Sequence, residues 1–403
     1  MPIKTDKKLI EELLTRGVEN IYPKREFLEE RLKKGDELTI YLGIDPTGPC
    51  LHIGHAIQLM KLRQFQQLGH KVILLMGDFT GMIGDPTDKS ATRKQLTYEQ
   101  VRENLKNYKE QASKILDFEG ENPVDVRFNN DWLGKLTFKE VIELAAEFTV
   151  QQLLVRDMFD KRMKEGKPIG LHEFLYPLMQ GYDSVAMDVD VEVGGSDQIF
   201  NMLAGRTLMK SLSGKEKVVV ASSLLADPTG VKMGKTEGNM ITLIDSPQDM
   251  FGKVMSWTDG MILGGFELCT IVPMEEVDKI KKELEGGMNP RDAKMHLARE
   301  IVTLYYDEKA AKQAEEEFKN IFQKGGKPDE IELKKLSQTK WKLVDLLAET
   351  GLTSSKSEAR RLIEQGGVRV NDEKVSDKEM EVEIKKETLL QVGKRKFLRV
   401  CSG

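Results

Sequence analysis

The sequence has little cysteine and no long apolar run. Its three cysteines, Cys50, Cys269 and Cys401, lie far apart among 403 residues and form no Cys-x-x-Cys pair. This spacing argues against a cysteine-rich zinc site and is typical of proteins from a reducing compartment. No apolar segment approaches the ~20 residues that a membrane-spanning helix needs, and the stretch from Lys4 to Glu12 is charged. We therefore expect a cytoplasmic protein that does not contact a membrane.

The sequence also lacks an overall positive charge. Its formal net charge is −5, which excludes a uniformly basic nucleic-acid coat. Residues 338–403, however, carry 14 Lys and Arg against 11 Asp and Glu, a net charge of +3. Any contact with RNA is therefore expected to be local and to involve this C-terminal segment. A chain of this length exceeds one ordinary core, so two or three domains are expected.

The stretch from residue 39 to residue 76 predicts a strand, a helix and a second strand. Thr39–Ile44 is apolar and β-branched and ends at turn residues. Ile53–Leu68 has apolar residues at helical spacing and is followed by Gly69, a typical helix C-terminal glycine. Val72–Met76 is again apolar. Short connections between such elements give a parallel βαβ unit, so we expect the α/β class with a Rossmann-like, nucleotide-binding parallel sheet.

Two histidines fall at the expected N-terminus of this helix. His52 and His55 are three residues apart and share one face of the first turn, where unpaired backbone amides favour anions. These donors together suit a phosphate, and Gly54 between them lets a flat ring such as adenine lie on the backbone. The alternative is that both are polar residues at a helix start without a further role. It is disfavoured because two of only five histidines gather here.

Two glycine-containing loops carry cations. Gly77–Thr87 follows the second strand and precedes Lys89 and Arg93. It is either a tight connection or, as we favour, a loop that approaches a phosphate. The second loop carries Lys232 and Lys235, which cannot be core residues. These two lysines are either solvated or in contact with phosphate.

Several segments between these loops predict helices. Residues 99–116 predict a surface helix, and residues 132–163 lie in a helical insertion of about residues 120–170 between two halves of the sheet. The surplus apolar surface of the insertion belongs either to the core or to a dimer face. The sequence leaves both possibilities open.

A later segment predicts a helix with three polar side chains on one face. Tyr176, Gln180 and Asp183 are spaced four and three residues apart. A carboxylate among apolar neighbours needs a partner, which is either a ligand or, for Asp183 alone, the backbone. Pro177 indicates that the helix begins or bends at this point.

Two more strands are expected at residues 189–193 and 218–220. The first alternates polar and apolar residues and runs into Gly194, Gly195 and Asp197. Small residues at the end of a strand followed by an acid suit a bound sugar, with Asp197 on ribose hydroxyls.

The remainder is expected to form a helical domain and a compact tail. We predict a catalytic domain at 1–245, a helical domain at 246–324, a linker at 325–337 and a small α+β domain at 338–403. Asn289 is the expected N-cap of a helix that starts at Pro290. In the tail, Leu343–Glu349 predicts a helix, Ser355 caps another, and Asn371-Asp372 predicts the turn of a hairpin.

Three segments resemble the signatures of one protein family. His52-Ile53-Gly54-His55 is similar to the first signature of the class I aminoacyl-tRNA synthetases. Lys232-Met233-Gly234-Lys235-Thr236 is similar to the second, with Gly234 and Thr236 where serines are common. Thr353–Asn371 resembles the S4 RNA-binding domain. In this order, and over essentially the whole length, the chain resembles the bacterial tyrosyl-tRNA synthetases.

The resemblance implies a role for each site residue. The phenol hydroxyl of tyrosine would be held by Tyr41 and Asp183, its α-amino group by Asp85, Tyr176 and Gln180, and its carboxylate near Gln198. The ATP ribose would lie near Gly195 and Asp197. The ATP phosphates would meet Thr47, His52 and His55 on one side and Lys89, Arg93, Lys232 and Lys235 on the other. In the S4-like tail, RNA would contact a basic face of Lys356, Arg360, Arg361, Arg369 and Lys374.

The resemblance also implies a tyrosine–tRNA ligase that uses ATP with Mg²⁺ as substrate and has no metal site of its own. Its partners would be L-tyrosine, tRNA(Tyr) and a second copy of the chain docked on the insertion, and it would be cytoplasmic. The amino acid carboxylate is already a nucleophile, so attack on the α-phosphorus of ATP needs positioning and phosphate-binding donors rather than a general base.

Other functions remain to be weighed. The related tryptophanyl enzymes share both signatures, but the S4-like tail and the pairing of Tyr41 with Asp183 for a hydroxyl speak against them. A small adenylyltransferase would have no use for an RNA-binding tail. A synthetase-derived RNA-binding or splicing protein without turnover stays possible, and exchange of labelled pyrophosphate into ATP would exclude it.

Overall fold

The structure is a computed structural model that describes residues 1–87, 96–226, 240–323, 331–336, 338–353, 355–384, 387–393 and 396–402. The chain divides into two compact units, Met1–Glu308 and Lys309–Gly403. Within the described ranges, none of the helices combines the length and the apolar character that a membrane span requires.

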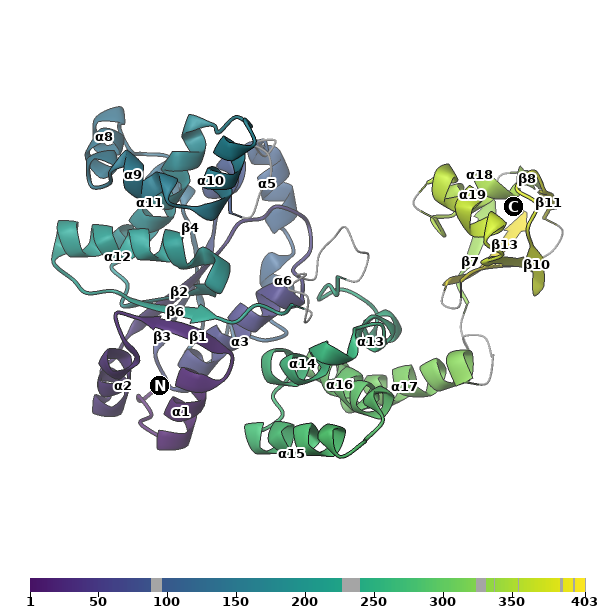
Figure 1. The fold of residues 1–403 in the computed structure, drawn as a ribbon, viewed down its shortest axis with the longest axis horizontal. Coiled ribbons are helices and arrows are strands. Elements are labelled where there is room, and N and C mark those ends of the chain that lie inside the picture. Colours follow the sequence, from purple (N-terminus) through teal and green to yellow (C-terminus); the bar gives the residue numbers. More distant parts are fainter. Residues whose placement is uncertain are drawn as a thin grey trace. The chain divides into compact units, whose positions relative to one another are not determined.

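A twisted sheet forms the centre of the first unit (Figure 1). Its strand order in the described residues is β1-β6-β5-β2-β3-β4. The bounds are β1 Val18–Tyr22, β2 Thr39–Ile44, β3 Lys71–Met76, β4 Asp125–Phe128, β5 Val191–Gly195 and β6 Val218–Ser222. Strands β2 to β6 run parallel, as predicted, whereas β1 pairs antiparallel with β6. The chain runs outward from β2 to β4 and then returns to β5 beside β2, so the switch in direction lies between β2 and β5.

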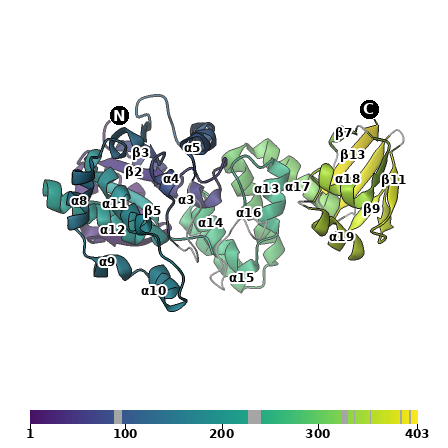
Figure 2. The same cartoon turned by 90° about the horizontal axis from the view of Figure 1, so that it is seen from above.

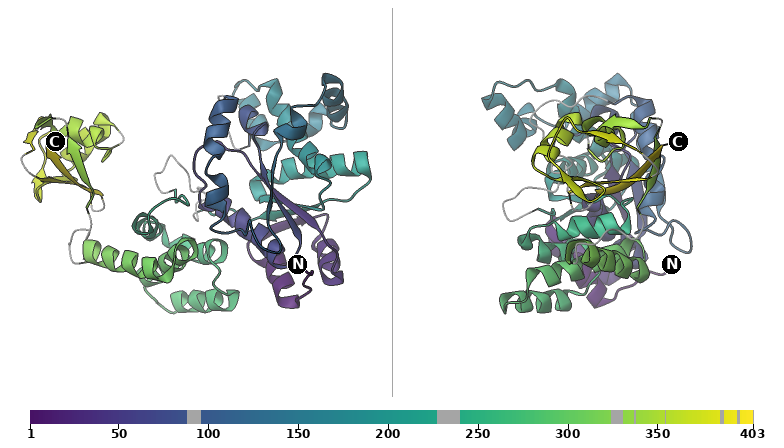
Figure 3. Two further views of the ribbon diagram at one scale, coloured as in Figure 1. Left: turned by 180° about the vertical axis from the view of Figure 1, so that it is seen from behind. Right: turned by 90° about the vertical axis from the view of Figure 1, so that its right-hand side faces the viewer.

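Helices cover both faces of this sheet (Figure 3). On one face α3 (Ile53–Gln67) packs against β2, β3 and β5. On the other, α11 (Leu171–Ala186) packs against α12 (Ile199–Ser213), which covers β5 and β6. Because both faces are covered, all residues of β5 are buried and the alternation expected from its sequence is not seen. Gly69 ends α3 at φ 92°, as expected of a helix C-terminal glycine.

Several helices outside the sheet differ from the sequence prediction. The expected single helix at 99–116 is broken into α5 (Tyr98–Leu105) and α6 (Tyr108–Ala112). The break buries Tyr108, whose hydroxyl donates to the Gly48 carbonyl at 2.6 Å. The loop expected at 77–87 contains the short helix α4 (Thr80–Ile83). The helix expected near Pro177 begins earlier, at Leu171, and carries the proline inside it.

The helical insertion lies between β4 and β5 along the chain, and the predicted bounds of about 120–170 begin too early because they include β4 of the central sheet. It consists of α7 (Asn130–Leu133), α8 (Phe138–Ala146), α9 (Val150–Leu154) and α10 (Asp157–Lys164). Thr137 and Thr149 cap α8 and α9, accepting from backbone amides three residues on. These caps divide a long apolar sequence into short helices.

The remaining helices of the first unit surround the sheet or follow it. They are α1 (Lys7–Thr15), α2 (Arg25–Lys34), α13 (Pro247–Met255), α14 (Ile262–Cys269), α15 (Met274–Glu285) and α16 (Pro290–Tyr305). Asn289 caps α16 as predicted. The predicted boundary at residue 245 does not separate compact units, because residues up to Glu308 group with the sheet. Arg16, which follows α1, ties α14 and the residues after it to this unit, because its guanidinium donates to the carbonyls of Phe266, Thr270 and Val272.

The second unit starts in α17 (Glu308–Gln323) and continues as a small α+β fold (Figure 2). Its described strands form one sheet in the order β10-β9-β12-β13-β7 and a separate pair, β11-β8. The bounds are β7 Leu333–Leu336, β8 Lys340–Lys342, β9 Val368–Val370, β10 Glu373–Val375, β11 Glu381–Glu383, β12 Thr388–Val392 and β13 Lys396–Ser402. Helices α18 (Leu343–Glu349) and α19 (Lys356–Glu364) pack together beside them.

Local signals in this unit are confirmed, but the predicted linker is too long. Asn371 and Asp372 take φ of 48° and 71° in the β9–β10 turn, as a two-residue hairpin requires, and Ser355 Oγ accepts from Glu358 N. The segment 325–337, however, includes β7, which pairs in parallel with β13 and buries Leu336. The folded tail therefore begins at or before Leu333.

Candidate active site

A cavity of about 350 Å³ opens at the carboxyl ends of β2 and β5. It brings together every predicted ligand-binding residue of the first unit that the structure describes. These are Tyr41, Thr47, His52, Gly54, His55, Asp85, Tyr176, Gln180, Asp183, Gly195, Asp197 and Gln198. Lys89, Arg93, Lys232 and Lys235 lie outside the described residues.

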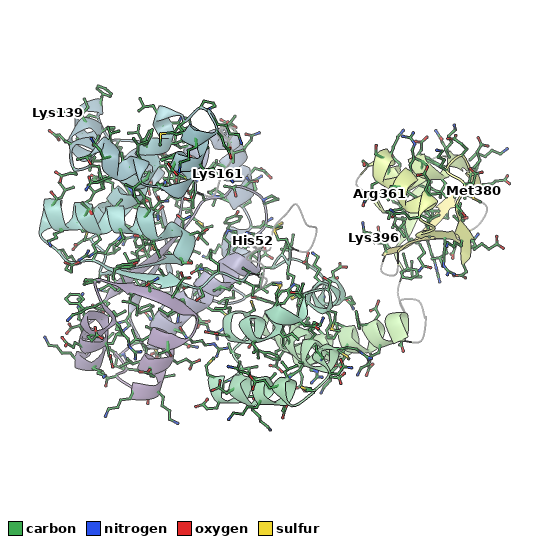
Figure 4. The ribbon with its side chains drawn as sticks, in the orientation of Figure 1. His52, Lys139, Lys161, Arg361, Met380 and Lys396 are labelled. Carbon is green, nitrogen blue, oxygen red and sulfur yellow. The ribbon has the colours of Figure 1, made fainter. Side chains whose placement is uncertain are left out.

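The start of α3, where Figure 4 labels His52, presents two stacked imidazoles to this cavity. The ring centroids of His52 and His55 lie 3.8 Å apart, with 28° between the ring planes. The backbone amide of His52 donates to His55 Nδ1 at 3.2 Å. A neutral His55 therefore carries its proton on Nε2, as a donor. A Cβ added to Gly54 would lie only 3.0 Å from His52 Cε1, so a larger residue there would press on the His52 ring.

Asp183 is held by side-chain donors in a fully buried position. Asp183 Oδ1 accepts from Trp132 Nε1 at 2.8 Å, and Oδ2 accepts from Asn129 Nδ2 at 3.3 Å. Burial raises the pKa of this carboxyl well above its usual range, and the two donors oppose the shift. The sequence left open whether the Asp183 carboxylate is bonded to the backbone. In the structure two side chains orient it instead. Neither partner was identified from the sequence.

A second set of hydrogen bonds organises the rest of the cavity wall. Tyr176 Oη donates to Asp45 Oδ2 at 2.7 Å, and Thr80 Oγ1 donates to Asp45 Oδ1 at 2.6 Å. Gln198 Nε2 donates to Asp85 Oδ2 at 2.8 Å. Asp45 and Thr80 were missed by the sequence analysis, although Asp45 directly follows β2, where parallel strands present functional side chains.

Beneath the cavity lies a buried ion pair that the sequence analysis also missed. Lys217 and Glu192 are almost fully buried and form a direct salt bridge. Glu192 Oε1 accepts from Gln180 Nε2 at 3.0 Å. Since a carboxylate can only accept, the Gln180 nitrogen must face Glu192, which leaves Gln180 Oε1 as an acceptor. The available signal was a charged residue directly before one buried strand, Lys217, and another inside a buried strand, Glu192.

Two glycines at the end of β5 keep part of the cavity wall bare. A Cβ on Gly195 would lie 2.6 Å from Asp197 Oδ1, and one on Gly194 would lie 2.7 Å from the sulfur of Met202. Backbone atoms therefore line the cavity beside Asp197, which leaves room for a ligand to lie against the strand end.

In the second unit, the predicted basic residues are exposed on neighbouring elements. Lys356, Arg360 and Arg361 lie on α19, and Arg369 and Lys374 lie on the hairpin β9–β10. Figure 4 labels Arg361. A Cβ on Gly366 would collide with the Lys374 side chain, so Lys374 lies over the end of α19. The hairpin thus adds at least one cation to the basic end of the helix.

Comparisons with known proteins give one consistent result. A model of class I tRNA synthetases (W and Y) matches residues 33–323, and one of the tyrosine–tRNA ligase SYY-like C-terminal domain matches residues 323–400. A tyrosine–tRNA ligase of Moorella thermoacetica is 49% identical over 96% of this chain and 94% of its own length. One of Thermotoga maritima is 46% identical over 97% of both.

Solved structures match in the same way. A C-terminally truncated mitochondrial tyrosyl-tRNA synthetase of Aspergillus nidulans is 25% identical, with a TM-score of 0.65 over 79% of this chain and 95% of that one. A tyrosyl-tRNA synthetase of Archaeoglobus fulgidus, complexed with L-tyrosine, shares the fold with a TM-score of 0.60 at 20% identity, over 76% of this chain and 99% of that one.

Proposed function

This chain belongs to the class I tRNA synthetases of the tyrosine–tRNA ligase family, and from that premise we propose how its residues carry out the reaction. A tyrosine–tRNA ligase joins L-tyrosine and ATP to form tyrosyl-adenylate and pyrophosphate. It then transfers the tyrosyl group to the 3′ end of tRNA(Tyr).

We propose that tyrosine binds with its ring between β2 and α11. Tyr41 and Asp183 contact the phenol hydroxyl, and both are buried side chains of the cavity wall. The α-amino group binds among Asp85, Tyr176 and Gln180, whose Oε1 is turned away from Glu192. Gln198 lies near the carboxylate, next to its partner Asp85. The hydroxyl and carboxylate of Tyr41 and Asp183 at one end and the acidic Asp85 at the other match a phenol and an ammonium.

ATP would bind across the start of α3. Gly54 lies under the adenine, Gly195 and Asp197 contact the ribose, and Thr47, His52 and His55 donate to the phosphates. The orientation of His55, with Nε2 as donor, supports this role. Lys89, Arg93, Lys232 and Lys235 would close on the phosphates from the other side, and Mg²⁺ would arrive with ATP as part of the substrate.

The reaction then requires alignment rather than a base. The tyrosine carboxylate attacks the α-phosphorus, the bond to the β-phosphate oxygen breaks, and pyrophosphate leaves with the electron pair. Donors that strengthen their hydrogen bonds as charge moves to the pyrophosphate lower the barrier. In the second step a ribose hydroxyl of the tRNA attacks the acyl carbon and AMP leaves.

The observation that carries this proposal is that a buried carboxylate with two side-chain donors and a pair of stacked histidines line one cavity. The test is aminoacylation of unfractionated bacterial tRNA with labelled tyrosine, with labelled tryptophan as the control. Charging with tyrosine alone is expected. Charging with tryptophan would contradict the assigned substrate, and no charging with either would favour a non-catalytic RNA-binding protein.

We propose that the insertion mediates a homodimer. Phe138 on α8 is 81% exposed and Val150 on α9 is 66% exposed, with Ile142 between them also exposed. Phe138 and Ile142 are four residues apart and share one face of α8, and exposed apolar side chains of this kind mark protein–protein interfaces. Phe138→Glu should shift the sedimentation mass toward the monomer, whereas Leu212→Glu, at a half-exposed leucine of α12, should not. A wild-type monomer would contradict the proposal.

The basic residues of α19 and the β9–β10 hairpin are proposed to contact the tRNA in a cytoplasmic enzyme. Exposed cations on adjoining elements bind the phosphates of a folded RNA and recognise its shape. By this assignment the sheet and the helices around the cavity carry out catalysis, the helices after residue 245 contact the anticodon side of the tRNA, and the S4-like tail anchors the RNA.

A further inference from the structure

The hydroxyl of Tyr41 is connected to the buried ion pair beneath the cavity. Tyr41 Oη lies 2.9 Å from Ser184 Oγ, and Lys217 Nζ lies 2.9 Å from the same Ser184 oxygen. Tyr41, Ser184 and Lys217 are each fully buried. The three groups therefore form a chain from the salt bridge to the side chain proposed to meet the substrate phenol.

The direction of the hydrogen bonds along this chain follows from which of the three groups can donate and which can accept. An ammonium can only donate, so Ser184 Oγ accepts from Lys217. Ser184 has one hydroxyl proton, and among the described residues the acceptor within hydrogen-bond distance is Tyr41 Oη. If Tyr41 donated to Ser184 instead, the serine proton would be buried without an acceptor, which is unfavourable. Ser184 therefore donates to Tyr41, and the Tyr41 proton turns away from Ser184, either to the Glu192 carboxylate, with which Tyr41 also forms a side-chain hydrogen bond, or to a ligand in the cavity.

We propose that Lys217 and Ser184 are positioning residues that fix Tyr41 as a hydrogen-bond donor to the substrate phenol oxygen. This rests on the proposed binding of the phenol by Tyr41 and Asp183. The phenol then accepts from Tyr41 and donates its own proton to the Asp183 carboxylate. A site with this polarity selects a group that can both accept and donate, as a hydroxyl does.

The packing of α11 against α12 keeps this chain in place. Gly205 of α12 faces the group, and a Cβ there would lie 2.8 Å from Ser184 Oγ. The Glu192 carboxylate balances the charge of Lys217, so the lysine can remain an ammonium in a buried position. Both features favour a fixed donor direction at Ser184.

The test compares tyrosine with L-4-aminophenylalanine, whose aromatic amine donates well but accepts poorly. Ser184→Ala removes one oxygen and leaves the salt bridge of Lys217 with Glu192 intact. Tyr41 is then free to turn its proton elsewhere and to accept from the amine. The ratio of kcat/KM for tyrosine to that for 4-aminophenylalanine, measured by pyrophosphate exchange, should fall roughly threefold to tenfold, as expected for one neutral hydrogen bond.

Ser222→Ala is the matched control, because Ser222 is a buried serine whose Oγ has no hydrogen-bond partner among the described residues. It should leave the ratio unchanged. If Ser184→Ala lowers kcat/KM equally for both substrates, the ratio stays at the wild-type value, and Ser184 has only a structural role. Failure of the wild-type protein to use tyrosine at all would instead contradict the proposed function, so the two failures are distinct.

Discussion

Trp132 Nε1 donates a hydrogen bond to Asp183 Oδ1 across 2.8 Å in the buried wall of the cavity. Asn129, the residue directly after β4, donates to the other carboxylate oxygen, Oδ2. The segment that follows edge strand β4, Asn129 and helix α7, thus orients a carboxylate of α11. Both oxygens of Asp183 are acceptors, and each has a lone pair left for the substrate.

Replacement of Asp183 with Asn should strongly impair the use of tyrosine. The amide must turn an NH₂ group toward Trp132 or Asn129, both of which are donors, and its oxygen accepts more weakly than a carboxylate. We expect kcat/KM for tyrosine in pyrophosphate exchange to fall roughly 10- to 100-fold, the range for a hydrogen bond to a charged group. Asp188→Asn, at an exposed residue just after the same helix, should have no such effect. An unchanged kcat/KM in Asp183→Asn would show that the carboxylate is structural.

Replacement of His55 with Ala should slow adenylate formation without weakening tyrosine binding. The imidazole is proposed to meet phosphate oxygens whose charge grows in the transition state, and loss of such a donor costs on the order of 10² to 10³ in rate. Single-turnover kinetics give the rate, and equilibrium dialysis gives the tyrosine Kd. His172→Ala, outside the cavity, is the control. A large rise in Kd with an unchanged rate would contradict the phosphate role.

Neutralising Arg360 and Arg361 together should weaken tRNA binding but leave tyrosine activation intact. Both side chains are exposed on α19, and removing a cation that binds an RNA phosphate should reduce the salt dependence of binding as well as the affinity. The measurement is KM for tRNA at two salt concentrations, beside pyrophosphate exchange. Lys340→Ala, on the separate β8–β11 pair, is the control. Equal losses in both assays would indicate a folding defect rather than an RNA contact.

Stability in mild acid should depend on His70. Burial lowers the pKa of this fully buried imidazole to about 4, whereas the unfolded chain has a value near ~6.5. Between these values the unfolded state binds a proton that the native state does not, so stability falls as the pH drops from ~6.5 to about 4, by up to about 3 kcal/mol.

His70→Asn keeps an acceptor for the Leu38 amide, which now donates to His70 Nδ1 at 3.4 Å, but cannot titrate. Urea unfolding at pH 7.5 and pH 4.5 should therefore show a smaller loss for the variant than for the wild type. Equal losses in both proteins would mean that His70 does not titrate as proposed.

Local sequence signals identified much of the architecture. The strand, helix and strand from residue 39 to residue 76 could be predicted from the spacing of apolar residues and from a terminal glycine. The turn at Asn371-Asp372 could be predicted because both residue types tolerate positive φ. These features are set by neighbours in the chain. The same holds for the capping side chains of Asn289 and Ser355, whose amide partners lie two or three residues away.

Long-range pairings were not accessible in the same way. The salt bridge of Lys217 with Glu192 joins the residue before β6 to the second residue of β5, and the partners of Asp183 lie more than 50 residues earlier in the chain. Strand β7 also depends on a distant partner, since its ladder is with β13 near the C-terminus. Such pairings depend on the tertiary fold, so the sequence could supply the residue types but not their partners.

The central claim is that the cavity selects tyrosine through its hydroxyl and activates it with ATP. The most direct measurement is pyrophosphate exchange by the purified wild-type protein, with tyrosine, phenylalanine and tryptophan compared at equal concentration. We predict exchange with tyrosine, strong discrimination against phenylalanine because Tyr41 and Asp183 lose their partner, and none with tryptophan. Equal exchange with phenylalanine or tryptophan, or none with tyrosine, would contradict the account.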